Sequence, residues 1–189
     1  MSVSPDSNQP SLVPASVDLI DFTRLDSDTS TKVLEWRNHE AVRRWMLRTS
    51  PISEAEHEAF LQALKHDTTK RYFVIMLKGE AIAVIDFYRI HPDKRSCYFG
   101  YYLRPDKIGS SLGILLEFLV AEYALVNLGM DQLIAETMPT NTSAMELHQR
   151  FGFEPAGVNT SALQEAVLTA KIWHTRRDNF AAIIERLTS

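Results

Sequence analysis

Two neighbouring segments rich in apolar, aromatic and β-branched residues constrain the fold of this chain. Residues 71–77 and 81–88 flank the short turn Lys78-Gly79-Glu80, and this pattern predicts a β-hairpin. A third strand is predicted over residues 96–103. It ends before Pro105, because proline cannot donate a hydrogen bond to a strand ladder. The three segments together predict antiparallel strands in the middle of the chain.

Helices are predicted before these strands. A short strand at residues 20–22 precedes a helix for which Ser30 is the expected N-cap. Ser53-Glu54-Ala55-Glu56 forms a capping box, in which the serine side chain binds the amide of Glu56 and the glutamate reaches back. A second helix therefore begins at this point.

The second half of the chain alternates helices and strands. A strongly apolar helix is predicted over residues 113–127, with Gly129 as its C-terminal stop. A buried strand at 132–136 follows it, then a helix that begins after Asn141 and stops at Gly152. A strand over 166–173 and a helix over 178–187 complete the series. This order predicts an α/β fold in mixed layers.

The length and composition of the chain limit its number of domains, its disulfides and its metal content. The chain has 189 residues, and its first 17 are rich in serine and proline, so we expect a flexible tail at 1–17 and a single domain over 18–189. The single cysteine, Cys97, allows no internal disulfide, and no zinc-type spacing is present, so we expect no metal. We find no membrane-length apolar run and no secretion signal, and we expect a cytoplasmic protein.

The net charge is mildly negative. Twenty Lys and Arg against 24 Asp and Glu give a formal charge of −4, so we expect neither nucleic acid nor an anionic membrane as a partner. An anionic ligand must therefore be held by a local site. The loop from Lys107 to Gly113 is the first candidate, because a small-residue turn at a helix N-terminus presents free amides to a phosphate. Such loops can also be plain helix caps.

A second motif follows one strand later. Asn141, Ala144, Leu147, Gly152 and Phe153 occur at the spacing Asn-x-x-Ala-x-x-Leu-x-x-x-x-Gly-Phe. With the pair Gly100 and Pro105, this pattern resembles the GNAT family of N-acetyltransferases. The chain departs from the family at two places. The glycines of the phosphate loop are displaced to Gly109 and Gly113, and His148 replaces the tyrosine that usually protonates the leaving thiolate.

The N-terminal half narrows the resemblance. Its blocks at residues 20–22, 33–39, 45–46, 52–60 and 71–73 resemble the branch of the family that works in pseudaminic acid biosynthesis. That branch acetylates the 4-amino group of a UDP-linked 4-amino-4,6-dideoxy sugar. The similarity extends from about residue 20 to 157.

The resemblance implies a fold, a co-substrate and a binding site for it. The implied fold has a central mixed, mostly antiparallel sheet, splayed between two parallel central strands and flanked by helices. The implied co-substrate is acetyl-CoA, with the amide of Leu103 binding the thioester carbonyl and stabilising the oxyanion. The expected acetyl-CoA contacts are Leu103, Lys107, Ile108, Gly109, Ser110, Ser111, Leu112, Gly113, Asn141 and Arg150. Asn141 is equally a normal N-cap.

Three side chains are candidates for proton transfer. Glu136, at a strand end, is the expected base that takes the proton of the attacking amine, although it can also be a solvated surface residue. Asp86 is its rival, because an acid inside an apolar strand requires a partner or a task. His148 can protonate the thiolate, or water can do so instead. Cys97 has no evident neighbouring base and is a poor nucleophile candidate, which favours direct transfer.

The expected acceptor is a UDP-linked amino sugar. Its contacts implied by the resemblance are Arg37, Met46, His57, Phe60 and Tyr98, of which Arg37 can pair with the diphosphate or be a simple surface arginine. A protein N-terminus or a polyamine is an alternative acceptor. A CoA-binding module without turnover also stays open, and a homodimer is possible.

Overall fold

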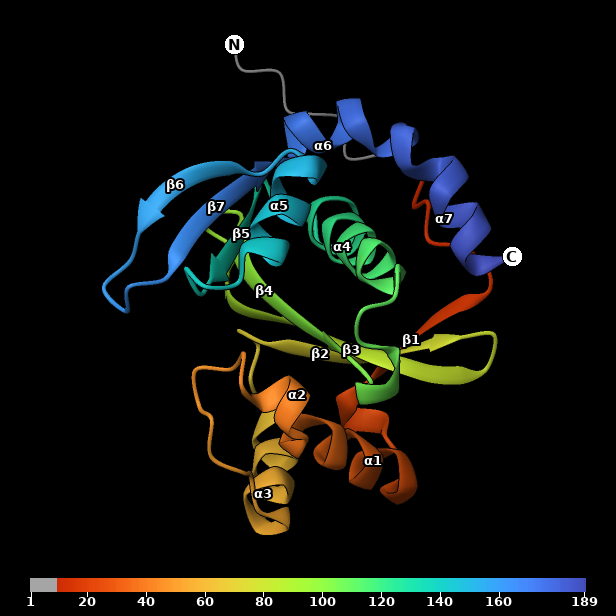
Figure 1. Ribbon diagram of the computed structural model, residues 1–189, viewed down its shortest axis with the longest axis vertical. Coiled ribbons are helices and arrows are strands. Elements are labelled where there is room, and N and C mark those ends of the chain that lie inside the picture. The colour runs from red at the N-terminus through yellow and green to blue at the C-terminus, as the bar shows by residue number, and fades with distance from the viewer. Residues whose placement is uncertain (1–9) are drawn as a thin grey trace.

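A seven-stranded sheet organises residues 10–189, the part of the chain that the computed structural model describes (Figure 1). The strand order is β1-β2-β3-β4-β5-β7-β6, and every neighbouring pair is antiparallel except β4 and β5, which are parallel. The mixed, mostly antiparallel sheet expected from the resemblance is therefore confirmed. The strands are β1 (Val17–Asp21), β2 (Arg71–Leu77), β3 (Glu80–His91), β4 (Ser96–Leu103), β5 (Gln132–Thr137), β6 (Glu154–Val158) and β7 (Gln164–Thr169).

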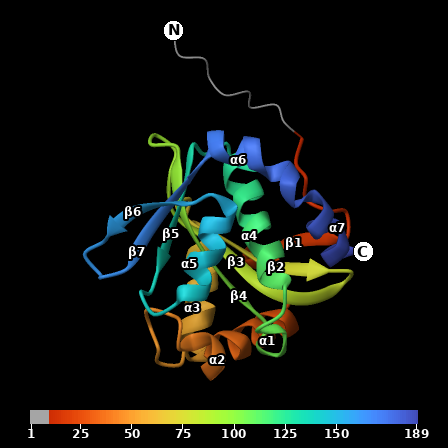
Figure 2. The ribbon, with the colours of Figure 1, turned by 45° about the horizontal axis from the view of Figure 1, so that its top comes forward.

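Helices cover both faces of the sheet. Figure 1 shows α1–α3 on one face and α4–α7 on the other, and Figure 2 shows α4 and α5 next to each other. The helices are α1 (Ser27–Asn38), α2 (Glu40–Arg43), α3 (Glu54–Leu64), α4 (Leu112–Glu122), α5 (Thr142–Phe151), α6 (Ala170–Arg176) and α7 (Ala181–Thr188). Short 3₁₀ turns lie at Phe22–Arg24, Pro105–Lys107 and Arg177–Phe180, and a π-turn at Tyr123–Asn127 extends α4.

The alternation of side chains along the strands divides the core in two. Ile75, Ile85 and Phe99 belong to the core under α4, whereas Val74 and Val84 belong to the core against α1 and α3. Successive residues of a strand point to opposite faces, so one strand contributes to both cores. This arrangement explains why β2 and β3 are apolar throughout.

The two central strands separate beyond their first four residue pairs. β4 and β5 are paired from Ser96 with Gln132 to Phe99 with Ala135. From Gly100 onward β4 pairs only with β3, and β5 continues beside β7. The amide of Arg104 donates to the carbonyl of Ile82 in β3 at 2.8 Å. Backbone groups alternate in direction along a strand, so the Leu103 amide faces the opening between β4 and β5.

The predicted boundaries of several elements differ from the structure. The short strand expected at 20–22 is β1 (Val17–Asp21), and Phe22 begins a 3₁₀ turn instead. Asp26, not Ser30, caps α1, because its carboxylate accepts from the Thr29 amide at 2.7 Å while the Ser30 hydroxyl contacts the His57 ring at 3.0 Å. The strand predicted over 166–173 was wrong beyond residue 169. Thr169 accepts a hydrogen bond from the Ile172 amide at 3.3 Å and starts α6, in which Trp173 is fully buried.

The sequence analysis also missed β6. Its residues Glu154-Pro155-Ala156-Gly157-Val158 are typical of a turn. They form an edge strand because β7 offers them a ladder, and the pairing is irregular between Pro155 and Gly157. Proline is tolerated at such an edge. The final helix begins at Ala181, after a 3₁₀ turn, rather than at Asp178.

The N-terminal segment from residue 10 onward is attached to the domain. The Arg177 guanidinium donates to the Pro10 carbonyl at 2.8 Å, and the Leu12 amide donates to Glu122 at 3.2 Å. The Ser16 hydroxyl donates to the carbonyl of Thr188 at 3.0 Å. Residues 1–9 of the predicted flexible tail lie outside the described residues, whereas residues 10–16 are bound by α4, by the 3₁₀ turn at Arg177 and by α7. Within residues 10–189, no helix combines the length and apolar character that crossing a bilayer requires.

Candidate active site

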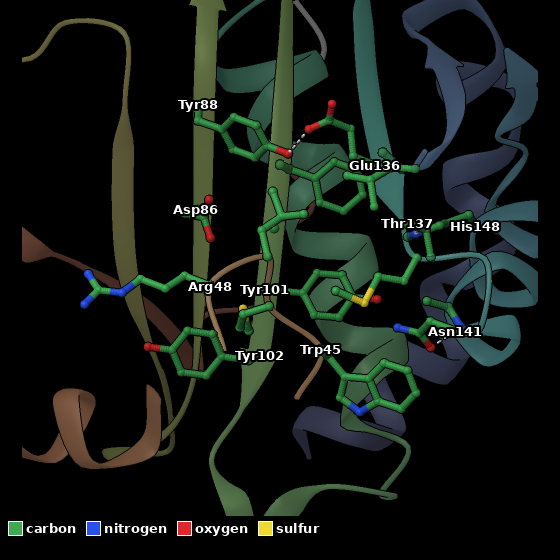
Figure 3. A pocket seen from close by; sticks show the side chains of 18 of the residues that line it. Trp45, Arg48, Asp86, Tyr88, Tyr101, Tyr102, Glu136, Thr137, Asn141 and His148 are labelled. Atoms are coloured by element: carbon green, nitrogen blue, oxygen red, sulfur yellow. Dashed lines mark hydrogen bonds between the residues drawn. The ribbon is translucent and has the colours of Figure 1, made fainter. Parts of the chain in front are cut away.

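A cavity of about 480 Å³ lies where β4 and β5 separate (Figure 3). Two pairs of consecutive residues, Tyr101 with Tyr102 and Glu136 with Thr137, line it. Because neighbouring residues of a strand point to opposite faces, the cavity reaches both faces of the sheet. One face of the sheet carries α1–α3, and the other carries α4 and α5. Two reactants can therefore meet in this opening from opposite sides.

Asp86 lies on the α1–α3 side of the cavity. It faces Gly100 across the β3–β4 ladder, where a Cβ atom in place of the glycine hydrogen would lie 3.0 Å from the Asp86 carboxylate. Gly100 thus leaves the space that this side chain occupies. Burial raises the pKa of Asp86 to about 7, and the positive charge of Arg37 offsets part of this effect. The carboxyl group can therefore exchange a proton near neutral pH.

Glu136 lies in the same cavity, but its carboxylate already accepts three hydrogen bonds. The donors are the Tyr88 hydroxyl at 2.8 Å, the Arg89 guanidinium at 3.0 Å and the Asn159 amide at 2.6 Å. Its side chain is 5% exposed. These three hydrogen bonds occupy lone pairs that would otherwise be free to accept a proton. Of the two rival acids, the geometry thus favours Asp86 as the base.

His148 lies on the α5 side of the cavity and is buried. Its Nδ1 lies 2.7 Å from Oε1 of Glu117 in α4, and its Nε2 lies 3.2 Å from the Thr137 hydroxyl. The Tyr101 hydroxyl donates to the second oxygen of Glu117 at 2.8 Å. Both ring nitrogens are thus occupied by a buried polar network that opens into the cavity.

Asn141 performs the capping role that its position predicts and also lines the cavity. Its side-chain oxygen accepts a hydrogen bond from the Ala144 amide at 3.4 Å and caps α5. α5 ends at Gly152, whose φ of 98° is in the left-handed region. The cap and the glycine stop set the ends of the helix that presents His148.

The loop before α4 offers free amides. The backbone amides of Gly109, Ser111 and Gly113 make no hydrogen bond to another backbone group in the described part of the chain. Gly109 has a φ of 85°, and α4 adds the positive end of its dipole. This geometry fits a phosphate group despite the displaced glycines. Leu103, the loop residues 107–113 and the exposed Arg150 do not line the cavity itself.

On the acceptor side, Arg37 and Met46 line the cavity as expected. Arg37 donates to the Arg48 carbonyl at 3.1 Å through Nη2, while its Nη1 is buried without a hydrogen-bond partner among the described residues. Burial lowers the pKa of Arg37. An unpaired buried donor of this kind suits an anion.

His57, Phe60 and Tyr98 do not line the cavity. His57 contacts Ser30, and Phe60 packs edge-on against Tyr72 with ring centroids 5.0 Å apart. Tyr98 lies beside Tyr88, with ring centroids 5.6 Å apart. Phe60 and Tyr98 therefore contact residues that line the cavity without lining it themselves, and His57 contacts Ser30, which does not line it.

Cys97 is fully buried, and burial raises the pKa of its thiol to about 12. It does not line the cavity either. Both findings oppose a role as nucleophile, because the thiolate is the reactive form. Within residues 10–189, no group of three or more His, Cys, Asp or Glu side chains is arranged to hold a metal ion.

Several residues of the site were missed by the sequence analysis. The tyrosines among them are one in β2, one in β3 and two consecutive ones in β4, and this concentration in neighbouring strands could have been read from the sequence. Glu117 was also missed, although it is an isolated acid within the apolar run of α4. The additional lining residues are Trp45, Leu47, Arg48, Tyr72, Tyr88, Phe99, Tyr101, Tyr102, Ala135, Thr137, Met138 and Leu163.

Comparison with known proteins identifies the family. Residues 19–154 match the family described as the acetyltransferase (GNAT) domain. The chain belongs to the GNAT family. This GNAT protein is 34% identical over 137 residues to the acetyltransferase PseH of Campylobacter jejuni, a match that covers 72% of this chain and 84% of PseH.

Solved structures agree with this assignment. The crystal structure of C. jejuni N-acetyltransferase PseH matches with a TM-score of 0.67 and 26% identity, over 82% of this chain and 98% of PseH. A second PseH structure, in complex with acetyl coenzyme A, matches with a TM-score of 0.67 and 27% identity, over 81% and 98%. The spermidine N-acetyltransferase of Vibrio cholerae in complex with CoA and spermine shares the fold, with a TM-score of 0.73 and 16% identity, over 85% and 99%. The GNAT protein described here is thus an acetyl-CoA-dependent N-acetyltransferase.

Proposed function

We propose that this enzyme acetylates the 4-amino group of a UDP-linked 4-amino-4,6-dideoxy sugar, in the biosynthesis of pseudaminic acid or a related surface glycan. The observation that carries the proposal is the buried, unpaired Nη1 of Arg37 at the cavity. A guanidinium group is suited to a diphosphate, which it can bind through two parallel hydrogen bonds. The resemblance of the N-terminal half to the amino-sugar acetyltransferases agrees with this assignment.

Aromatic side chains next to Arg37 support a nucleotide-linked acceptor. Tyr72 and Tyr102 lie close enough to Arg37 to affect its pKa, and Trp45 lines the same cavity. Aromatic faces bind flat bases and the apolar faces of sugars by stacking. In this proposal Arg37 holds the diphosphate, and the aromatic group orients uracil or sugar so that the amine reaches Asp86.

Direct transfer follows from the placement of these groups. Asp86 takes a proton from the acceptor ammonium, and the free amine attacks the thioester carbon. A carbon–nitrogen bond forms, and the Leu103 amide, which faces the opening, stabilises the oxyanion. The carbon–sulfur bond then breaks, and the thiolate is protonated on the His148 side of the sheet. Base and acid thus act from opposite faces.

The two alternatives have weaker support. A polyamine acceptor would require several free carboxylates, yet Glu136 is paired with Arg89 at 3.0 Å and two arginines line the cavity. A CoA-binding module without turnover would not require an aspartate whose pKa is raised to about 7 in the cavity, whereas proton transfer does. The expectations of a cytoplasmic location and of a possible homodimer remain part of this proposal.

CoA release from acetyl-CoA, measured with a panel of acceptors, tests the proposal. UDP-linked 4-amino sugars should be acetylated with the highest kcat/KM, and spermidine and peptide N-termini should react at least about 100-fold less efficiently. Arg37→Met should raise KM for the nucleotide sugar and leave KM for acetyl-CoA unchanged. A preference for spermidine or a peptide would overturn the proposed acceptor. Ping-pong kinetics would exclude the direct mechanism.

A further inference from the structure

Glu117 is a fully buried acid in the middle of α4, whose other residues are mostly apolar. It does not line the cavity. Burying a carboxylate costs several kcal/mol unless other groups compensate its charge and its hydrogen-bonding capacity. The partners of Glu117 therefore indicate what it does.

Both carboxylate oxygens of Glu117 point to groups at the cavity. Oε1 lies 2.7 Å from Nδ1 of His148, and Oε2 accepts from the Tyr101 hydroxyl at 2.8 Å. The opposite ring nitrogen, Nε2, lies 3.2 Å from Oγ1 of Thr137. The series carboxylate, imidazole and hydroxyl begins inside α4. It ends at Thr137, which lines the cavity together with His148 (Figure 3).

The remaining surroundings of the imidazole are aromatic. Phe99 of β4 and Phe153 pack against the ring, with centroid distances of 5.7 and 5.2 Å. The polar groups that face it are Glu117 from α4, Tyr101 from β4 by way of Glu117, and Thr137 from β5. Since both nitrogens are engaged, a proton that leaves the ring toward the cavity leaves through Nε2 and Thr137.

We propose that Glu117 is a positioning residue that holds His148, and that this pair supplies the proton of the leaving thiolate through the Thr137 hydroxyl. The inference rests on the proposed acetyl transfer. Glu117 keeps the proton on Nδ1 and stabilises the imidazolium, so that Nε2 faces Thr137 as a donor. The arrangement replaces the single tyrosine hydroxyl that the family normally has at position 148.

The protons of this step can be followed from the His148 ring to the leaving sulfur. As the carbon–sulfur bond breaks, its electron pair stays on sulfur, and the Thr137 hydroxyl gives its proton to the sulfur. Oγ1 of Thr137 then receives the Nε2 proton of the imidazolium. His148 becomes neutral and keeps its Nδ1 proton toward Glu117. The nitrogen loses a second proton as the amide forms. This proton and the one that Asp86 took from the ammonium pass to solvent, and His148 takes one proton back from solvent, so one proton is released overall.

The first test is Glu117→Gln in the full-length enzyme. Loss of the carboxylate should lower kcat about 10- to 100-fold and leave both KM values within about twofold. Glu117→Asp should restore part of kcat. Glu122→Gln is the matched control, since Glu122 is another fully buried acid of α4 and binds Trp173 and Arg177 away from the cavity. It should lower Tm and leave kcat within about twofold of the wild-type value.

Two further comparisons separate positioning from plain structure. In a His148→Phe background, Glu117→Gln should have no further effect on kcat, because the two residues act as a unit. Thr137→Val should lower kcat about tenfold or more, and Thr137→Ser should retain it. Additive effects in the double variant, or equal kcat for the two Thr137 variants, would overturn the proposal. If Glu117→Gln does not fold, the comparison of kcat between Thr137→Val and Thr137→Ser still tests the proposal.

A readout without an acceptor distinguishes this inference from the proposed function. The ¹⁵N signals of the His148 ring should show a protonated Nδ1 in the wild-type protein and lose that preference in Glu117→Gln. If the enzyme acetylates no UDP-amino sugar but the ¹⁵N pattern holds, the proposed acceptor fails and the placement of His148 stands. If the wild-type ring carries its proton on Nε2 alone, the inference fails.

Discussion

At the scale of single residues, Asp86 is the side chain whose environment most affects the chemistry. It lines the cavity from β3, is half-buried, and accepts no hydrogen bond from the described residues. Burial therefore raises its pKa to about 7. The carboxylate of Glu136, by contrast, accepts three hydrogen bonds. A carboxylate with free lone pairs and a pKa near neutral is suited to take a proton from an ammonium group.

Asp86→Asn should lower kcat about 10²- to 10⁴-fold, because the amide cannot accept the ammonium proton. The wild-type rate should rise with pH through about 7, as Asp86 loses its proton. Glu136→Gln serves as the comparison and should affect kcat less. The measurement is the pH dependence of CoA release. A larger loss in Glu136→Gln than in Asp86→Asn would return the role of base to Glu136.

The same raised pKa predicts a pH-dependent stability. The pKa of Asp86 is about 7 in the folded protein and about 3.9 in an unfolded chain, so the folded state binds more protons between these values. Stability contributed by this group is therefore greatest below pH 4 and falls as pH rises to about 7. The Asp86→Asn variant has no ionisable group at this position, so its stability should not fall for this reason as the pH rises. Urea unfolding should show it more stable than wild type by on the order of 1 kcal/mol or more at pH 8, with a smaller difference at pH 5.

At the scale of elements, the N-terminus of α4 and the C-terminus of α5 position the groups for the co-substrate and for proton transfer. Ser111 lies directly before α4, and its amide is among those free to bind a phosphate. Ser111→Glu should raise KM for acetyl-CoA about tenfold or more, since a like charge at about 4 Å costs on the order of 1–4 kcal/mol. Ser111→Gln has the same size without the charge and should change KM by less than about threefold. Equal KM values for both variants would place the phosphates elsewhere.

The end of α5 depends on Gly152. Its φ is 98°, and a Cβ atom there would lie 3.0 Å from both Ile172 and Arg176 in α6. Gly152→Ala should therefore destabilise the protein by about 2–4 kcal/mol, from backbone strain and overpacking. Gly129→Ala is the control, because Gly129 also has a positive φ, of 65°, but would meet no atom within 4 Å. It should cost only about 1 kcal/mol. Thermal unfolding of both variants measures the difference.

At the scale of the whole molecule, a buried ion pair joins the two ends of the described chain. Arg177 lies 2.9 Å from Glu122 of α4, and both side chains are at most 3% exposed. Arg177 also holds the Pro10 carbonyl at 2.8 Å, and Glu122 holds the Leu12 amide at 3.2 Å. The N-terminal segment, α4 and the C-terminal turn therefore depend on one another for their placement.

Arg177→Met should lower the free energy of unfolding by about 3–5 kcal/mol, because it leaves the Glu122 charge buried without its partner. The surface pair of Arg95 and Asp131, at 2.8 Å and about half exposed, provides the control. Arg95→Met should cost about 1 kcal/mol or less. Denaturant unfolding of the two variants tests the contrast. Equal costs would mean that the buried pair adds nothing to stability.

Much of the fold and part of the site could be predicted from local sequence signals. Turn residues, caps and periodicity indicated the hairpin, the third strand and α5, because these signals act over a few residues. Asp86 could be recognised as a candidate because it is an acid in an apolar strand. His148 could be recognised by its position in the family motif. Trp173 was assigned to a strand, because an apolar segment after β7 has no local feature that separates strand from helix.

The sequence by itself determined the order of the elements, the family and the set of candidate acids. The tertiary structure decided which acid is free to act and how His148 is held. The donors that occupy Glu136 come from residues 88, 89 and 159, and the carboxylate that faces His148 lies 31 residues away in another helix. Burial and hydrogen bonding between distant residues set the proton affinity of a group, so these roles emerge only when the chain has folded.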